Sequence, residues 1–351
     1  MISLVAHNRD AANDSLRSQT AISNCDLKGN SMQRYGITIP FDGVPLLEQE
    51  DWVKELADLG YTDFWSAESG GSDGFTPLIL AAQWAKQARV GTAIIPAYTR
   101  GAGTLASCVS SLEEAAPGRS VIGIGSSSNV IVERWNSIAF EKPYQRVRDT
   151  VRFLKQALTG EKISEDYETF SVKSYRLTRL PASPPKIMIA ALRQGMLGLA
   201  GREADGAILN WLTAEDMKTV APYVHAGGEG KELVARLFVI PTANKELAHN
   251  IGRRAIAAYL NVPVYAAFHE WLGRGDQLKG MWDLWKAGDR AAALEAIPGE
   301  LVDELIINGS PEACKEHVQR YVENGLHTPV LAILPSDADM REVSKQLAPS
   351  A

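Results

Sequence analysis

Residues 90–124 read VGTAIIPAYTRGAGTLASCVSSLEEAAPGRSVIGI, and this stretch decides the fold class. Val90–Pro96 is a short apolar run of β type, and 103–116 has a helical pattern that Pro117-Gly118 ends. Ser120–Ile124 is a second apolar run. Two such runs joined by a helix are typical of a βαβ unit, in which the two strands are parallel.

The same alternation continues on both sides of this stretch. The strand candidates are 35–39, 62–66, 90–96, 120–124, 186–190, 205–210, 234–240 and 328–334. The helix candidates are 46–59, 77–88, 103–116, 144–158, 194–203, 214–225, 244–260 and 310–325. Eight strand–helix units of this kind predict an α/β fold that closes into a (β/α)8 TIM barrel. An open doubly wound sheet is the alternative, but no GxGxxG follows the first strand.

We expect one domain over 34–335, with insertions after strand four and after helix seven. The first insertion is a polar loop at 125–142 and a short hairpin at 168–177, and the second is a helical segment at 261–308. Residues 1–33 are polar and either form a loosely ordered arm or precede a natural start at Met32. Residues 336–351 form a C-terminal tail.

Composition excludes several classes of protein. The net charge of −6 argues against a general nucleic-acid partner, because such proteins carry a basic surface. No apolar run approaches the roughly 20 residues that cross a membrane. Three scattered cysteines, Cys25, Cys108 and Cys314, favour a reducing cytoplasm over a disulfide framework or a zinc site. The histidines show no metal spacing, and no P-loop, HExxH or Ser-His-Asp order is present, so we expect no metal.

Barrel enzymes bind ligands where the strands end, so these ends hold the candidate site. Ser126–Asn129 offers hydroxyl and amide groups, and Ala191–Gly195 leads into a helix whose N–H groups favour phosphate, with Arg193 adding charge. The alternative is a polar loop and an ordinary helix start. Glu68, at the end of strand two, is a candidate acid or base, although a surface ion pair is the commoner fate of such a residue.

Several motifs together resemble the bacterial-luciferase-like superfamily of flavin and deazaflavin enzymes. The longest is IGIGSSSNVIVERWN at 122–136, followed by Phe140–Pro143. Shorter ones lie at 73–78, 91–94, 146–151, 190–192, 199–206 and 210–212. The resemblance covers roughly 34–335 and is closest to the coenzyme F420-dependent branch, near the methylene-tetrahydromethanopterin-reductase-like enzymes.

The resemblance implies where a cofactor would lie. The ring would cross the barrel mouth, backed on strand three by a non-prolyl cis peptide at Ala93–Ile94, with the side chain and phosphate on the loops after strands four and five. The resulting cofactor-binding candidates are Phe41, Asp42, Ala93, Ile94, Gly125, Ser126, Ser127, Asn129, Ala191, Leu192, Arg193, Gln194, Gly195, Asn210 and Trp211.

The chain also departs from the sugar-phosphate dehydrogenase branch of the family. That branch has an Asp-His pair where Ala67-Glu68 stands here, and an acid where Ser126 stands. The resemblance as a whole implies an F420-dependent oxidoreductase that moves a hydride between the deazaflavin C5 and an unidentified small-molecule substrate. Glu68 is the catalytic candidate. The alternatives are an FMN-dependent luciferase-like monooxygenase and an F420-binding protein without turnover. Family habit suggests a homodimer.

Overall fold

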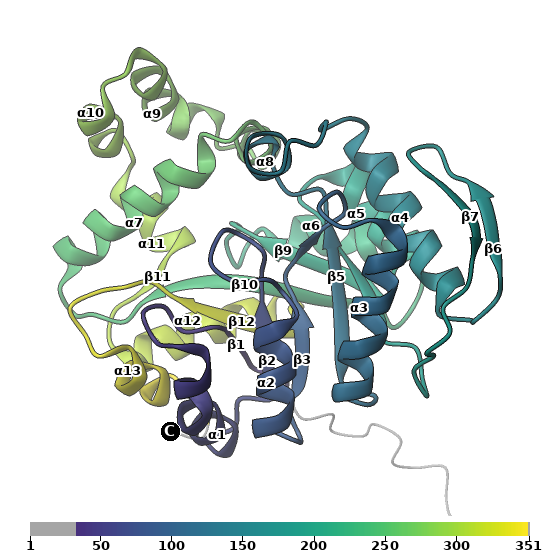
Figure 1. Cartoon of the computed structure of the whole chain (residues 1–351). Coiled ribbons are helices and arrows are strands. Elements are labelled where there is room, and N and C mark those ends of the chain that lie inside the picture. The colour runs from purple at the N-terminus through teal and green to yellow at the C-terminus, as the bar shows by residue number, and fades with distance from the viewer. Residues whose placement is uncertain (1–32, 350–351) are drawn as a thin grey trace, which may run out of the picture. The chain divides into compact units, whose positions relative to one another are not determined.

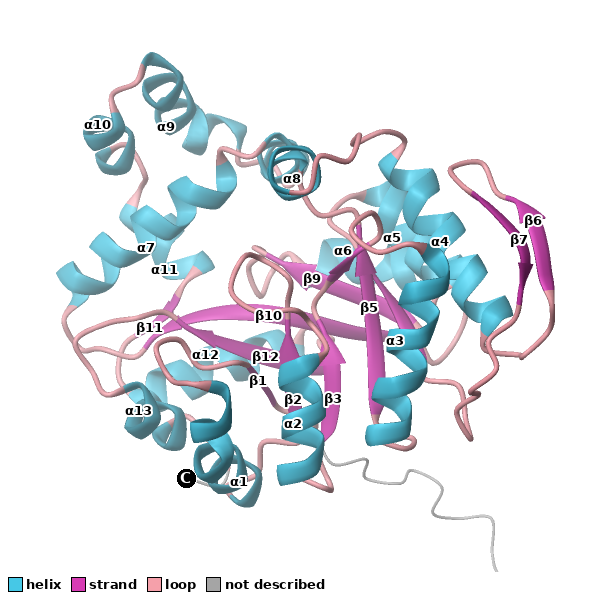
Figure 2. Ribbon diagram, viewed as in Figure 1, coloured by secondary structure: helices cyan, strands magenta, loops and turns pink. Residues whose placement is uncertain are grey.

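The computed structural model describes residues 33–349, so nearly all of the predicted arm at 1–33 lies outside the described residues. Eight parallel strands form the barrel, and the pairing of β9 with β10 closes it (Figures 1 and 2). They are β1 (Gly36–Thr38), β2 (Asp63–Ser66), β3 (Arg89–Thr92), β5 (Ser120–Gly125), β8 (Lys186–Ala190), β9 (Gly206–Asn210), β10 (Glu232–Ile240) and β12 (Thr328–Ile333). The predicted (β/α)8 barrel is confirmed.

Helices follow the strands and cover the outside of the barrel (Figure 1). They are α1 (Glu50–Asp58), preceded by the 3-10 turn η1 (Leu46–Gln49), then α2 (Thr76–Trp84), α3 (Ala102–Ala115), α4 (Pro143–Ala157), α5 (Gln194–Glu203), α6 (Met217–His225), α7 (Lys245–Leu260) and α12 (Pro311–Glu323). Helix α2 ends four residues before its predicted end at residue 88. Arg119 donates hydrogen bonds to the carbonyl oxygens of Ala82, Ala85 and Ala88. These bonds satisfy carbonyl groups at and just beyond the C-terminal end of α2, which the helix itself leaves unpaired.

The middle of the barrel is filled by a single large side chain. Trp65, on β2, is fully buried and packs with one aliphatic side chain from each of five other strands, Val121, Met188, Ile208, Val234 and Val330. Gly91 makes room for it, because a Cβ there would lie 2.5 Å from the indole. The barrel is therefore a packed core whose ligand space lies only at its ends.

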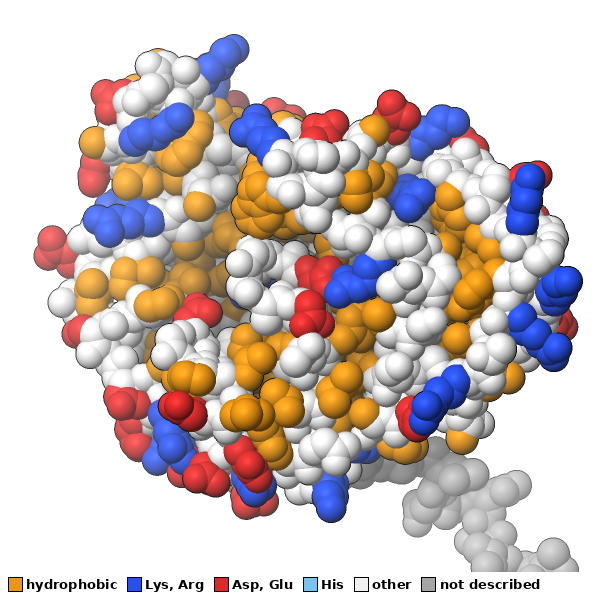
Figure 3. Space-filling model, in the orientation of Figure 1, with side chains coloured by type: hydrophobic (Ala, Val, Ile, Leu, Met, Phe, Trp, Pro, Cys, Tyr) orange, Lys and Arg blue, Asp and Glu red, His pale blue; other side chains and the backbone are white. Residues whose placement is uncertain are grey.

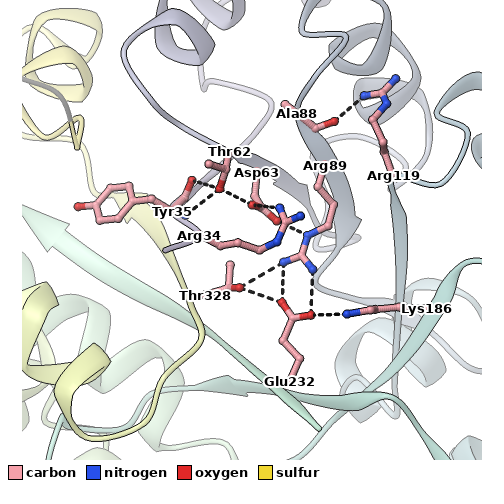
Figure 4. Close-up of polar contacts among 10 residues, drawn as sticks. All are labelled: Arg34, Tyr35, Thr62, Asp63, Ala88, Arg89, Arg119, Lys186, Glu232 and Thr328. Carbon is pink, nitrogen blue, oxygen red and sulfur yellow. Dashed lines mark hydrogen bonds and ion pairs between the residues drawn. The ribbon is translucent and has the colours of Figure 1, made fainter. Parts of the chain in front are cut away.

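An ionic network closes the base of the barrel, where the strands begin (Figure 4). Arg89 donates to Glu232 through Nη1 at 2.9 Å and Nη2 at 2.7 Å, and it also pairs with Asp63. Lys186 approaches Glu232 at 3.1 Å. Burial alone would raise the pKa of Glu232, but hydrogen bonds and charge from Arg89, with Lys186 and Thr328, lower it to about 2.

Insertions lie in the two predicted places. After β5 come the π-helical turn η2 (Val130–Trp135) and the hairpin of β6 (Ile163–Asp166) and β7 (Ser171–Tyr175). The segment at 125–142 is thus not wholly a loop as predicted, because Val132 is buried and orders the turn. The hairpin begins five residues earlier than the 168–177 prediction.

The second insertion is helical, as predicted, and contains four helices. They are α8 (Pro263–Trp271), α9 (Gly275–Ala287), α10 (Arg290–Glu295) and α11 (Gly299–Leu305), followed by the short strand β11 (Ile307–Asn308). The insertion rises on the side where the barrel strands end, and hydrophobic side chains lie in a hollow beside it (Figures 1 and 3). In the C-terminal segment, α13 (Met340–Gln346) docks through Ser344, which accepts from Trp52 Nε1 at 2.8 Å.

Candidate active site

A bulge after β3 interrupts the regular sheet at the barrel mouth. Gly91 pairs with Val121 of β5, but Ile95 of the following strand β4 (Ile95–Pro96) pairs with Ile124. Four residue steps on one strand therefore face three on its neighbour, which defines a β-bulge. The peptide bond Ala93–Ile94 inside this bulge is cis, as the resemblance implied. The side chains of Ala93 and Ile94 pack on the Trp65 cluster.

Thr92 holds the bulge in place through its side chain. Its Oγ1 accepts the backbone N–H of Gly123 at 2.8 Å and donates to the carbonyl oxygen of the same residue at 3.1 Å. Both groups are buried, and the hydroxyl replaces the backbone partners that the bulge removes. A Cβ at Gly123 would lie 2.1 Å from the Thr92 carbonyl oxygen, so the two backbones approach as closely as glycine permits.

The loop after β5 places the predicted hydroxyl and amide groups beside this bulge. Gly125 ends β5 against Ile94, whose Cδ1 would lie 3.0 Å from a Cβ at that position. Ser126, Ser127 and Asn129 are half-buried, and Ser127 has a left-handed backbone with φ of 62°. The structure thus brings this group of candidates to the side of the mouth that carries Ala93 and Ile94.

The end of β8 leads into a helix start that no side chain caps. Arg193 precedes α5 in an extended conformation and makes no side-chain cap. Arg193, Gln194 and Gly195 are exposed, whereas Ala191 is buried and Leu192 half-buried. No atom lies within 4 Å of the place that a Cβ on Gly195 would take. The first turn of α5 therefore has backbone N–H groups that its N-cap side chain does not bind.

Two candidates at the end of β9 differ in character. Asn210 donates from Nδ2 to the Tyr265 hydroxyl at 3.2 Å, while its buried Oδ1 has no hydrogen-bond partner within 33–349. Trp211 has φ of 55° and is buried, with its ring stacked on Phe238 at a centroid distance of 4.3 Å. Asn210 thus keeps an unpaired acceptor, and Trp211, although its ring packs on Phe238, keeps a buried Nε1 donor that has no hydrogen-bond partner within 33–349.

Phe41 and Asp42 lie away from the other cofactor candidates, at the end of β1. They line a cavity of about 290 Å³ together with the ends of β2 and β12 and with Arg236 in the middle of β10. The ring of Phe41 is buried and stacks on Trp52 at 3.7 Å between centroids, while Asp42 is exposed. The candidates therefore divide between the β3, β5, β8 and β9 side of the mouth and the β1 side.

Glu68 stands at the end of β2 and has two partners. Its Oε1 lies 2.5 Å from Nη1 of Arg100 and accepts the backbone N–H of Gly74 at 3.0 Å. The Arg100 guanidinium also lies over the ring of Phe75, 5.1 Å from its centroid. The side chain of Glu68 is 14% exposed, so the ion pair is largely shielded from solvent. Such a carboxylate both orders the loop at 67–74 and remains near the mouth.

Sequence reasoning missed several polar groups of the mouth. Arg236 lines the cavity from the middle of β10, and Thr38 and Ser72 line it from β1 and the β2 loop. Arg236 had a readable signal, because it is the single charge within the apolar run 233–240. Arg100 had none, because its partner lies 32 residues earlier in the chain.

Two kinds of feature are absent from the described residues. Within 33–349, no three His, Cys, Asp or Glu side chains are grouped as metal ligands would be. No helix of the same part of the chain has both the length and the apolar character of a membrane span.

Comparison with known proteins defines the family. The family model described as luciferase-like monooxygenase matches residues 28–328, which is most of the chain. The chain therefore belongs to the luciferase-like monooxygenase family. Among curated relatives, the 5,10-methylenetetrahydromethanopterin reductase of Archaeoglobus fulgidus is 24% identical over 321 residues, covering 86% of this chain and 95% of the relative.

Solved structures share the fold at lower identity. The coenzyme F420-dependent tetrahydromethanopterin reductase of Methanopyrus kandleri superposes with a TM-score of 0.74 at 17% identity, covering 91% of this chain and 98% of that one. The oxygenating constituent of 3,6-diketocamphane monooxygenase from Pseudomonas putida, in complex with FMN, gives a TM-score of 0.63 at 15% identity, with coverage of 91% and 97%. Enzymes that use either cofactor thus share this barrel.

Proposed function

We propose that this protein is an oxidoreductase that binds coenzyme F420 at the barrel mouth and acts on a small organic substrate. The observation that carries the proposal is the bulge at 92–94 beside two polar strand ends. The M. kandleri structure, which is named as coenzyme F420-dependent, supports the deazaflavin over FMN.

The residues present fit such a cofactor. A ring would rest on the bulge of Ala93 and Ile94, and the unpaired, buried Oδ1 of Asn210 offers an acceptor to a polar ring edge. The groups at 125–129 and 191–195 would hold the side chain and the phosphate, because the start of α5 has no side-chain cap. An orphaned buried oxygen and an uncapped helix start are features that a bound polar ligand would complete.

When bound, the deazaflavin supplies hydride chemistry at its C5. The protein’s own part is to position the cofactor and the substrate, to exclude water and to move protons. The buried Trp65 cluster forms a dry floor below the mouth. Glu68 is our candidate for holding or accepting a proton at Oε1, with Arg100 and the Gly74 N–H fixing its position.

The second candidate is an FMN-dependent monooxygenase, in which reduced flavin activates oxygen. The similarity to the FMN-containing 3,6-diketocamphane monooxygenase favours it. A third reading, an F420-binding protein without turnover, rests on Ser126, which stands where one branch of the family carries an acid.

We also propose that the protein is a homodimer and that it is located in the cytoplasm. Light scattering tests the oligomeric state, and cell fractionation tests the location.

Turnover separates the three readings. Purified protein is mixed without oxygen with reduced F420 and a panel of small carbonyl and unsaturated acceptors, and oxidised F420 is followed by absorbance. An oxygen electrode follows reduced FMN in parallel. Acceptor-dependent F420 oxidation supports the proposal, oxygen uptake with FMN supports the monooxygenase, and cofactor binding without either supports the binding protein.

A further inference from the structure

The cavity beside the mouth is built from four neighbouring strands. Its lining comes from the ends of β1, β2 and β12 and from Arg236 of β10, which are consecutive in the sheet. The cofactor candidates other than Phe41 and Asp42 come from the remaining strands, β3 with β4, β5, β8 and β9. The cavity therefore adjoins the proposed cofactor side, because Arg236 of β10 is paired with Asn210 of β9 in the sheet. At about 290 Å³ it lies at the small end of the range for ligand pockets, roughly 300–1,000 Å³.

Arg236 is the cation of this cavity. Side chains alternate along a strand, so Arg236 shares the inner face of β10 with Glu232 of the base network and Val234 of the Trp65 cluster. Its guanidinium lies over the ring of Phe238, 5.0 Å from the centroid. Its Nε is buried without a hydrogen-bond partner, and within 33–349 it forms no ion pair.

The other polar groups of the lining leave this charge uncompensated. Thr38 Oγ1 and Ser72 Oγ are buried oxygens without hydrogen-bond partners in the described chain. Asp42 is the one carboxylate of the lining, and it lies on an exposed turn and does not pair with Arg236. A partly buried guanidinium with an orphaned N–H is costly unless a ligand completes it.

We propose that this cavity binds a small organic monocarboxylate, with its carboxylate on Arg236 and its apolar body against the cavity wall. The aliphatic part of the wall comprises Ile37, Ile39, Ala332, Ile333, Leu334 and Met340. Guanidinium and carboxylate match in geometry, because two N–H groups face two oxygens. The hydroxyls of Thr38 and Ser72 can donate to the same anion.

Charge balance favours a carboxylate over a phosphate. A single arginine neutralises one negative charge, so a phosphate dianion would keep an unbalanced charge, and Asp42 at the rim would oppose it. As the substrate class of the enzyme, this inference rests on the proposed function. As a binding site, it stands on the cavity alone.

Isothermal titration calorimetry with hexanoate tests the site on the full-length protein. Hexanamide is the matched neutral probe and inorganic phosphate the competing anion, all at one ionic strength. The variants are Arg236→Gln, which removes the charge, and Thr38→Val, which keeps the shape and removes one hydroxyl. Arg320→Gln is the control, because Arg320 is exposed on α12 and does not line the cavity.

We expect hexanoate to bind the wild type and Arg320→Gln alike. Arg236→Gln should bind it roughly tenfold to a hundredfold more weakly, and Thr38→Val several-fold more weakly, because hydrogen bonds between charged groups contribute about this much. Hexanamide and phosphate should bind the wild type far more weakly than hexanoate.

Three results would overturn the inference: no hexanoate binding by the wild type, equal binding by Arg236→Gln, or equal binding of hexanamide. Tighter binding of phosphate would replace the carboxylate by a phosphate-bearing ligand. Circular dichroism and the thermal midpoint of each variant without ligand show that it is folded. A parallel F420 titration separates the two proposals, because hexanoate binding that depends on Arg236 can persist when F420 does not bind.

Discussion

Arg100 Nη1 lies 2.5 Å from Oε1 of Glu68, and the same carboxylate oxygen accepts the backbone N–H of Gly74. This pair joins the end of β2 to the segment before α3 and orders the loop at 67–74. The side chains of Glu68 and Arg100 are 14% and 19% exposed, so the pair is largely shielded from solvent but is not fully buried. One carboxylate therefore has a structural role and an accessible position for chemistry.

Glu68→Gln separates these two roles. The amide keeps an acceptor for Gly74 but loses the charge and the ability to take a proton. If Glu68 transfers a proton, turnover should fall by roughly 10²–10⁴-fold while the Kd for F420 stays nearly unchanged. Steady-state kinetics and absorbance titrations measure the two quantities.

Arg100→Gln is the control for that experiment, because it breaks the ion pair and leaves the carboxylate. A positioning role alone predicts equal losses in both variants and an unchanged pH profile of turnover. A proton-transfer role predicts a larger loss in Glu68→Gln and disappearance of the ionisation from the pH profile. Unchanged turnover in Glu68→Gln would remove this residue from the mechanism.

Thr92→Val tests the bulge that backs the mouth. Valine keeps the shape but leaves the buried N–H and carbonyl of Gly123 without the hydroxyl at 2.8 and 3.1 Å. The free energy of unfolding should fall by about 3 kcal/mol, because buried unpaired groups cost roughly 1–3 kcal/mol each. Denaturant titration measures it. Thr92→Ser retains the hydroxyl and should lose less than about 1 kcal/mol; similar losses in both variants would contradict the account.

Gly91→Ala tests the packing of the barrel centre. A Cβ at residue 91 would meet the Trp65 indole at 2.5 Å, so the ring or the strand must shift. We expect a loss of about 2 kcal/mol in the free energy of unfolding. Gly71→Ala is the matched control, since no atom lies within 4 Å of its added Cβ. A Gly91→Ala protein as stable as this control would show that Trp65 does not fill the barrel as described.

The base network predicts a particular pH dependence. The pKa of Glu232 is about 2 in the folded protein against 4.5 for an ordinary glutamate. Because the folded value is depressed, its contribution to stability is present above pH 4.5 and is lost as the pH falls towards 2. Glu232→Gln should cost about 3 kcal/mol at neutral pH, since Arg89 is left buried without full compensation.

The stability difference between wild type and Glu232→Gln should then narrow over that acid range. Denaturant midpoints at a series of pH values measure the difference. Lys218→Gln, on an exposed surface pair, serves as the control and should change stability by less than about 1 kcal/mol at each pH. A gap between wild type and Glu232→Gln that stays constant with pH would exclude the depressed pKa.

Local patterns predicted most of the barrel, because each strand is an apolar run and each helix an amphipathic one. The errors arise where distant residues meet. Strand β10 begins at Glu232, two residues before its prediction, because Arg89, 143 positions away, neutralises this acid inside the barrel. Helix α2 ends early where Arg119 takes its carbonyl groups. Neither partner is visible in the local sequence.

The sequence predicted which strand ends form the candidate site, but not how these ends are arranged around the barrel mouth. The cis bond at Ala93–Ile94 came from the family resemblance, and composition alone could not have indicated it. The division of the mouth into two sides depends on the order in which strands close the barrel. Arg236 was overlooked although a lone charge in an apolar strand is an informative pattern.

The central claim, that this mouth binds a deazaflavin, is tested most directly by absorbance titration of the purified protein with F420 and, separately, with FMN. We predict saturable F420 binding with a Kd of roughly micromolar order and much weaker FMN binding. Tight FMN binding with no F420 binding would contradict the claim and identify the flavin monooxygenase as the better account.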